Sequence, residues 1–323
     1  MLTRRLVNVA LITTLAGLAP AVAQEFPERP IKLMVPYAAG GGTDAIARLV
    51  AQAVSEKLGQ TMVVENNGTA GGNLASQIVA TSPADGYTVL MANQGPMVVN
   101  PHIFKNIKVD PLQAFEPVTL LTSAPLVLVV PAKSQFNSIA DFLDFVKKNP
   151  AKLSYGSAGN GSASHLAAVL MAQLGNLDIT HVPYRGAGPA LNDLVSGQTD
   201  FMITTMPSVS GLISAGTVKA LAVTTEKRTK ALPNVPTLAE SGIKNYETGA
   251  WYGFVVPKGT PPEVVAKLRT ASVDAINSPL IRERFANEGA EPIGSTAEDF
   301  RKMMVEESAR WADVVKKSST IIN

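Results

Sequence analysis

Apolar and polar residues follow two periods along this chain, and their alternation predicts strands and helices in turn. Short apolar runs at residues 31–37, 61–65 and 87–92 have the length of buried strands. Between the first two runs, residues 43–58 carry apolar positions three and four apart, which predicts an amphipathic helix; another is expected around residues 74–79. This order of strand and helix predicts a mainly parallel sheet covered by helices.

The alternation starts again in the middle of the chain. The very apolar residues 126–130 are long enough to cross from one lobe into a second. Beyond them we predict helices at 139–148, 162–174, 187–196 and 208–214, and strands at 153–156, 179–182, 201–204 and 220–223. A further apolar strand, residues 248–256, can return the chain to the first lobe before a helical C-terminal part.

These elements predict an α/β protein of two lobes, with a mainly parallel sheet in each lobe and a ligand cleft between them. We assign residues 24–122 and 250–323 to lobe 1 and residues 123–249 to lobe 2. Phe300, Met304 and Trp311 fall on one face of the last predicted helix, and we interpret this stripe as core.

The N-terminus has the pattern of a secretory signal peptide. Arg4 and Arg5 precede an apolar region that ends in the small residues Ala21-Val22-Ala23. We therefore expect residues 1–23 to be removed and the mature protein to be periplasmic. Loss of the two arginines would leave basic and acidic residues equal in number, so nucleic acid and anionic membranes are not expected as partners.

The chain contains no cysteine, so the folded protein must depend on core packing alone. With 323 residues and 46% hydrophobic content, a core of sufficient size can form.

A glycine-rich loop links the first predicted strand to the first predicted helix. It contains Gly40, Gly41, Gly42, Thr43 and Asp44. Glycines allow backbone N–H groups to approach a ligand, and a helix N-terminus carries partial positive charge. The loop therefore predicts an anion site for a carboxylate, with Tyr37 as a wall of the pocket. We interpret Asp44 as the helix N-cap, which can also hold a water or a ligand amine, and not as a general base.

The second lobe repeats this arrangement between a predicted strand and a predicted helix. The loop contains Ser157, Ala158, Gly159, Ser162, Ser164 and His165. His165 can either donate to a ligand carboxylate or cap its own helix, and the sequence leaves both open. Glycine turns also occur simply to connect a strand to a helix, but two in matched positions favour a ligand held across the cleft.

Several other chemistries lack their sequence signatures. Three scattered histidines without cysteine do not predict a metal site. No serine has the two flanking glycines of a hydrolase nucleophile, and neither glycine loop has a P-loop lysine or a full dinucleotide fingerprint. We therefore predict no catalytic residue, no metal and no cofactor.

Several motifs together resemble the Bug family, the extracytoplasmic solute receptors of the tripartite tricarboxylate transporter system. They are Val35-Pro36-Tyr37-Ala38-Ala39-Gly40-Gly41-Gly42-Thr43-Asp44, Val64-Glu65-Asn66-Asn67, Ala70-Gly71-Gly72-Asn73, Pro83-Ala84-Asp85-Gly86-Tyr87, Tyr155-Gly156-Ser157-Ala158-Gly159-Asn160-Gly161-Ser162 and His181-Val182-Pro183-Tyr184. The resemblance implies a monomeric, two-lobed periplasmic binding protein of the Venus flytrap type II. Such a protein closes on a small carboxylate and delivers it to a membrane permease, and the family's carboxylate loops correspond to residues 40–44 and 157–165.

One position departs from the family pattern. The family often has an aspartate where this chain has Thr204. Since that aspartate would pair with a ligand ammonium, we expect a ligand without an amine, such as a di- or tricarboxylate or an aromatic acid. Two other functions stay open at this point: a sensor that presents the carboxylate to a membrane signalling partner, and a secreted enzyme that acts on a carboxylate.

Overall fold

The structure is a computed structural model that describes residues 25–318. The predicted signal peptide lies outside the described residues. Within residues 25–318, no helix is both long enough and apolar enough to cross a membrane.

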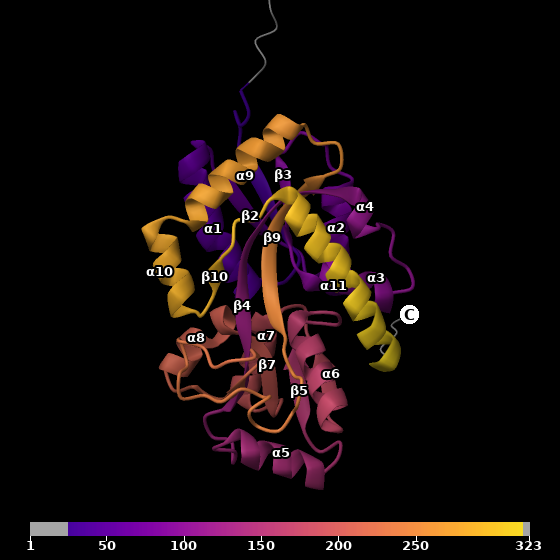
Figure 1. Ribbon diagram of the computed structural model, residues 1–323, viewed down its shortest axis with the longest axis vertical. Helices are drawn as coiled ribbons and strands as arrows, with labels where there is room; N and C mark the ends of the chain where they lie inside the picture. Colours follow the sequence, from indigo (N-terminus) through magenta and orange to yellow (C-terminus); the bar gives the residue numbers. More distant parts are fainter. Residues whose placement is uncertain (1–24, 319–323) are drawn as a thin grey trace, which may run out of the picture.

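Lobe 1 is built on the strands β1 (Ile31–Val35), β2 (Met62–Asn66), β3 (Thr88–Ala92), β9 (Gly249–Pro257) and the first part of β4 (Phe115–Pro131). Their order across the sheet is β2-β1-β3-β9-β4, and the short β10 (Glu291–Pro292) pairs with β4. The helices of this lobe are α1 (Gly42–Leu58), α2 (Asn73–Ala80), α3 (Asn100–Ile103), α4 (Pro111–Ala114), α9 (Pro262–Ile276), α10 (Pro279–Asn287) and α11 (Ala297–Ser318) (Figure 1).

Lobe 2 contains the second part of β4 with β5 (Ser154–Ser157), β6 (Thr180–Pro183), β7 (Phe201–Thr205) and β8 (Val218–Val223). Its helices are α5 (Ile139–Lys148), α6 (Ala163–Gly175), α7 (Ala187–Ser196) and α8 (Met206–Ser214), in the lower half of Figure 1. The two-lobed α/β fold predicted from the sequence is therefore confirmed. The division of the chain at residues 122 and 249 stays a prediction.

Two strands join the lobes. β4 is 17 residues long and pairs with β9 in lobe 1 and with β7 and β8 in lobe 2. β9 runs antiparallel to β4 down to the pair Gly249 and Pro125 (Figure 1). The sheets are parallel among β1, β2 and β3 and among β5, β6 and β7, as expected, while the crossing strands add antiparallel pairs.

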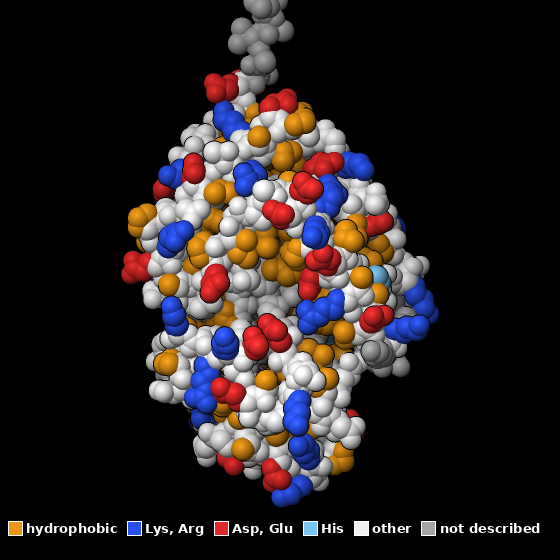
Figure 2. All heavy atoms as spheres, in the orientation of Figure 1, with side chains coloured by type: hydrophobic (Ala, Val, Ile, Leu, Met, Phe, Trp, Pro, Cys, Tyr) orange, Lys and Arg blue, Asp and Glu red, His pale blue; other side chains and the backbone are white. Residues whose placement is uncertain are grey.

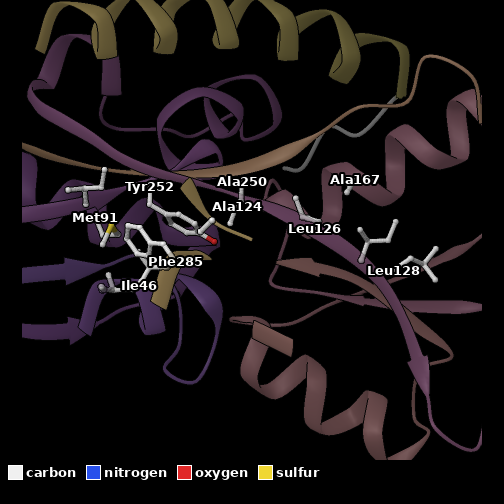
Figure 3. Packing of buried hydrophobic residues seen from close by; sticks show 14 of the residues in the cluster. Ile46, Met91, Ala124, Leu126, Leu128, Ala167, Ala250, Tyr252 and Phe285 are labelled. Carbon is white, nitrogen blue, oxygen red and sulfur yellow. The ribbon is translucent and has the colours of Figure 1, made fainter. Parts of the chain in front are cut away.

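The buried core continues through the crossing. Figure 3 shows Tyr252 and Phe285 on the lobe 1 side and Leu126 and Leu128 on the lobe 2 side of one hydrophobic cluster. The predicted stripe on α11 is also core, because Phe300, Met304 and Trp311 are buried. Thr296 accepts a hydrogen bond from the Asp299 N–H at 3.0 Å, which caps the helix.

The predicted strands and helices lie within two residues of those observed where both exist, except for β4, which begins at Phe115 and not near residue 126. The segment after β3 was not predicted: residues Gly95–Val99 form a π-helical turn, followed directly by the short α3. Pro96 and Gly95 interrupt the regular pattern there, so periodicity gave no signal.

Candidate functional site

A pocket lies between the lobes, at the carboxyl ends of the parallel strands. Its cavity volume is about 40 Å³. Its lining comes from both lobes and from the returning strand: Tyr37, Gly41, Gly42, Thr43, Asp44, Asn93, Gln94, Ala158, Ser162, Ala163, Ser164, Ala187, Thr204, Thr205, Ser208, Ala250 and Tyr252. This is the position at which open α/β sheets bind ligands.

Asp44 organises the first glycine loop instead of capping its helix. The N-cap of α1 is Gly41, and Asp44 lies in the first helical turn. The Asp44 carboxylate accepts hydrogen bonds from the Gly40 N–H at 3.0 Å and from Asn66 Nδ2 at 3.0 Å, and it pairs with Arg48 at 3.0 Å. The N-cap prediction was therefore wrong, because the glycine before the helix leaves room for the carboxylate to fold back onto the loop.

These partners also set the charge of Asp44. Burial alone would raise its pKa, but hydrogen bonds from Arg48, Gly40 and Asn66 outweigh burial and lower the pKa below its ordinary value. Asp44 is thus ionised, and the Arg48 guanidinium compensates its charge. Among the side chains lining the pocket, Asp44 is the single carboxylate, and no lysine, arginine or histidine lines it.

The cleft is closed, because backbone groups of lobe 1 bond directly to lobe 2. The Gly42 N–H, at the start of α1, donates to Ser208 Oγ of α8 at 2.7 Å. The Ala38 N–H donates to the Arg185 carbonyl at 2.9 Å. The N-terminus of α1 therefore meets lobe 2 across the pocket.

The second loop is held mainly by its own side chains. Ser162 is the N-cap of α6, Ser164 Oγ accepts from the Ala158 N–H at 2.8 Å, and Ser157 Oγ accepts from the Gly159 N–H at 3.1 Å. His165 Nδ1 accepts from the Gly161 N–H at 3.2 Å. The conformation of the loop is therefore supported by hydrogen bonds within the loop itself.

A pair of stacked histidines lies behind this loop. The rings of His165 and His181 are 4.2 Å apart, and His181 Nε2 is 2.6 Å from Ser157 Oγ. Burial, with the neighbouring His181, lowers the pKa of His165 to about 3, and burial lowers the pKa of His181 to about 4. Both rings are neutral at physiological pH and neither lines the pocket.

Two buried polar groups in the pocket have a polar atom without a hydrogen-bond partner: Asn93 Nδ2 and Gln94 Oε1. Asn93 Oδ1 accepts from the Tyr37 hydroxyl at 3.3 Å, and Gln94 Nε2 donates to the Gly249 carbonyl. Burial, with the nearby Glu288 charge, raises the pKa of Tyr252 to about 12, so its hydroxyl keeps its proton. Unpaired buried polar atoms are costly and indicate where a polar ligand is expected to bond.

Residues 46–320 match the model of the tripartite tricarboxylate transporter family receptor. The chain belongs to this family. The resemblance to Bug receptors is thereby confirmed.

Several known proteins match this chain over nearly their full length. The chain is 39% identical to the UPF0065 protein in the tcbD-tcbE intergenic region of Pseudomonas sp. strain P51, over 97% of this chain and 93% of that protein. It is 37% identical to the periplasmic binding protein BugD, with a TM-score of 0.88, covering 92% of this chain and 99% of BugD. It is 36% identical to Rpa4515 of R. palustris, solved with adipate, with a TM-score of 0.88 over 91% and 99% of the two chains.

The receptor's pocket contains most of the site residues predicted from the sequence. Those lining it are Tyr37, Gly41, Gly42, Thr43, Asp44, Ala158, Ser162, Ser164 and Thr204. Gly40, Ser157, Gly159 and His165 belong to the same loops but do not line it. Ligand contact by any of these residues stays a prediction.

Sequence reasoning missed part of the lining, including Asn93, Gln94, Ser208 and Tyr252. Asn93 and Gln94 directly follow the predicted strand at 87–92, so the rule that ligands lie at carboxyl strand ends could have found them. Tyr252 is both part of the core and a pocket wall.

Proposed function

We propose that this receptor captures a small organic carboxylate in the periplasm, between its two lobes, and delivers it to a tripartite tricarboxylate-type membrane permease. The ligand class is a di- or tricarboxylate or an aromatic acid. The adipate bound by the related Rpa4515 supports a carboxylate of this size. The family and its solved members are solute receptors, which supports a binding function without catalysis.

The observation that carries this proposal is a pocket rich in neutral hydrogen-bonding groups at two helix N-termini. Asn93 Nδ2 is a buried donor without a partner, and the protonated Tyr252 hydroxyl, which interacts with Thr43 and Thr205, also lines the pocket. The starts of α1 and α6 both line the same pocket. Each helix N-terminus favours an anion by roughly 0.3–1 kcal/mol, and a hydrogen bond to a charged group contributes roughly 1.5–3 kcal/mol.

The charge of Asp44 does not oppose this ligand class. Its two oxygens are occupied by Gly40, Asn66 and Arg48, and Arg48 compensates its charge. Thr204 is 1% exposed and presents a neutral side chain to the pocket. The pocket therefore lacks a free carboxylate that could pair with a ligand ammonium, which favours an acid without an amine.

Closure follows from the division of these groups between the lobes. Tyr37, Asn93 and Gly42 come from lobe 1, while Ser164 and Thr204 come from lobe 2. A ligand that bonds to both sets binds the closed state more tightly than the open one and shifts the population toward it.

The test is a thermal-shift screen of the mature protein against mono-, di- and tricarboxylates, aromatic acids and the corresponding amino acids, followed by calorimetric titration. At 100 times Kd, a ligand should stabilise the protein by about 2.7 kcal/mol. Absence of any carboxylate binder, or tight binding of amino acids alone, would contradict the proposal. Delivery is tested separately, by uptake of the radiolabelled ligand into cells with and without the receptor gene; uptake that does not depend on the gene would remove the transport role.

A further inference from the structure

We propose that the ligand carries a neutral hydrogen-bond donor beside its carboxylate, most simply a hydroxyl group, and that Gln94 Oε1 is the atom that selects it. This inference rests on the proposed carboxylate-binding function and narrows it to a hydroxy acid. Gln94 is then a specificity-determining residue at the base of the cleft.

The orientation of the Gln94 amide is fixed by its partner on the returning strand. Gln94 Nε2 donates to the carbonyl of Gly249, the first residue of β9. A carbonyl can only accept a hydrogen bond, so the amide nitrogen must face Gly249 and the amide oxygen must face away from it. Gln94 Oε1 is buried, has no partner and belongs to a side chain that lines the pocket and is 4% exposed.

The chemistry of this oxygen differs from that of its polar neighbours. Asn93 Nδ2 is a donor, and the Tyr252 hydroxyl can donate, so both suit a carboxylate oxygen. Gln94 Oε1 can only accept, and a carboxylate has no hydrogen to give it. A simple dicarboxylate would leave the amide oxygen unpaired or facing a carboxylate oxygen, and both arrangements are unfavourable.

The position of Gln94 places the expected donor close to the ligand's carboxyl group. Asn93 and Gln94 are consecutive residues directly after β3, so the acceptor Gln94 Oε1 and the unpaired donor Asn93 Nδ2 start from adjacent backbone positions. One small group that carries an oxygen anion and a hydroxyl on neighbouring carbons suits this pair. A 2-hydroxy acid has that arrangement.

An ammonium group would also donate to Gln94 Oε1, but the surroundings favour a neutral donor. Thr204 is uncharged, and the Asp44 carboxylate is already bonded to Gly40, Asn66 and Arg48. A buried ammonium without a carboxylate partner loses hydration that one amide oxygen cannot replace. A neutral hydroxyl loses far less hydration free energy on burial than an ammonium group does.

The experiment compares matched acids on the wild-type protein and on Gln94→Met. Calorimetric titrations use succinate with its 2-hydroxy counterpart malate, and adipate with 2-hydroxyadipate, so that chain length and charge are constant within each pair. Aspartate and 2-aminoadipate form the amine arm. Methionine keeps the volume of glutamine without its polar atoms, and circular dichroism verifies the fold.

We expect the wild-type protein to bind the 2-hydroxy acid of at least one pair roughly tenfold or more tightly than the unsubstituted acid. In Gln94→Met this preference should disappear, so that the ratio of the two affinities within a pair falls to about one, whatever common change both affinities undergo. Loss of the bond to Gly249 alone would instead change both affinities by the same factor, so the ratio within a pair reports the selective role.

Three outcomes overturn the inference. They are equal wild-type affinities within each pair, a hydroxyl preference that persists in Gln94→Met, and tighter binding of the 2-amino acids than of the 2-hydroxy acids. Equal affinities with tight binding would leave the carboxylate function intact and remove the role of Gln94, whereas no binding of any acid would remove the proposed function itself. If Gln94→Met does not fold, the ratio of the affinities of the wild-type protein for the 2-hydroxy acid and the unsubstituted acid decides whether the inference holds.

Discussion

Replacement of Gly42 by alanine should block closure of the cleft without harming the fold of either lobe. A Cβ atom on Gly42 would lie 2.2 Å from Thr205 Oγ1 and 2.8 Å from Ser208 Oγ. Both of these atoms belong to lobe 2, whereas Gly42 is the first residue of α1 in lobe 1. Its backbone is not in the left-handed region, so alanine can adopt the same conformation.

The expected loss of ligand affinity follows from the different surroundings of the new methyl group in the open and closed forms. In the open form the new methyl group meets solvent, and alanine is at least as good as glycine in a helix, by up to about 1 kcal/mol. In the closed form Thr205 must rotate away, although it is bonded to Ser208 at 2.8 Å. Overpacking of this kind costs roughly 1–3 kcal/mol. The apparent affinity should therefore fall roughly 5- to 150-fold.

The assay is calorimetric titration with the best carboxylate of the screen, together with thermal unfolding without ligand and small-angle scattering with and without it. Gly211→Ala is the matched control, because Gly211 lies in α8 and a Cβ there meets no atom within 4 Å. We expect Gly42→Ala to keep its unfolding temperature, lose affinity and stay extended when ligand is added, while the control behaves as wild type. Wild-type affinity in Gly42→Ala would refute the view that the ligand is bound in this closed arrangement.

Three further predictions concern charge. Because the native pKa values of His165 and His181 are about 3 and about 4 against 6.5 for free histidine, the unfolded chain binds protons that the native protein does not. As the pH is lowered from 6.5, the free energy of unfolding should therefore decrease by roughly 1.4 kcal/mol per pH unit for each histidine until the native pKa is reached. Urea titrations at pH 7 and pH 5 should show this decrease. If the free energy of unfolding of His181→Gln depended on pH as steeply as that of the wild type, the explanation would be wrong. Asp44→Asn should lower the free energy of unfolding by roughly 1.5–3 kcal/mol at pH 7. Because the native pKa of Asp44 is lowered, this difference between wild type and variant should vanish as the pH falls below 3.8. Equal stability of the two proteins in urea titrations at pH 7 would contradict this prediction. Thr204→Asp should weaken carboxylate binding at least tenfold through like-charge repulsion, and titration showing no loss would place Thr204 away from the ligand.

The two glycine loops and the strand and helix order were predictable because their signals are local. A run of glycines between an apolar strand and an amphipathic helix specifies a turn and a helix start regardless of the rest of the chain. Thr43 and Ser162 therefore appear in the pocket where the sequence placed them. The lining was not fully predictable, because the approach of Ser208 to Gly42 depends on how two distant parts of the chain meet.

The directions of the side chains in the second loop also could not be predicted from the local sequence. His165 turns its Nδ1 atom to the Gly161 N–H and stacks on His181, which comes from the neighbouring strand β6. The register of β5 and β6, which pairs Tyr155 with His181, decides that contact. Of the two roles left open for His165, the cap of α6 is provided by Ser162 instead, and ligand contact stays a prediction.

The insertion of β9 between β3 and β4 has a consequence for the folding of the newly made chain. β9 begins at Gly249, after every strand of lobe 2 has been made, yet it occupies the middle of the lobe 1 sheet. Until β9 arrives, β3 and β4 present unpaired edges, and lobe 1 cannot close its core. Completion of the first lobe therefore requires a contact between segments far apart in the sequence, which slows folding and leaves the chain open to chaperones or proteases for longer than the length of either lobe would suggest.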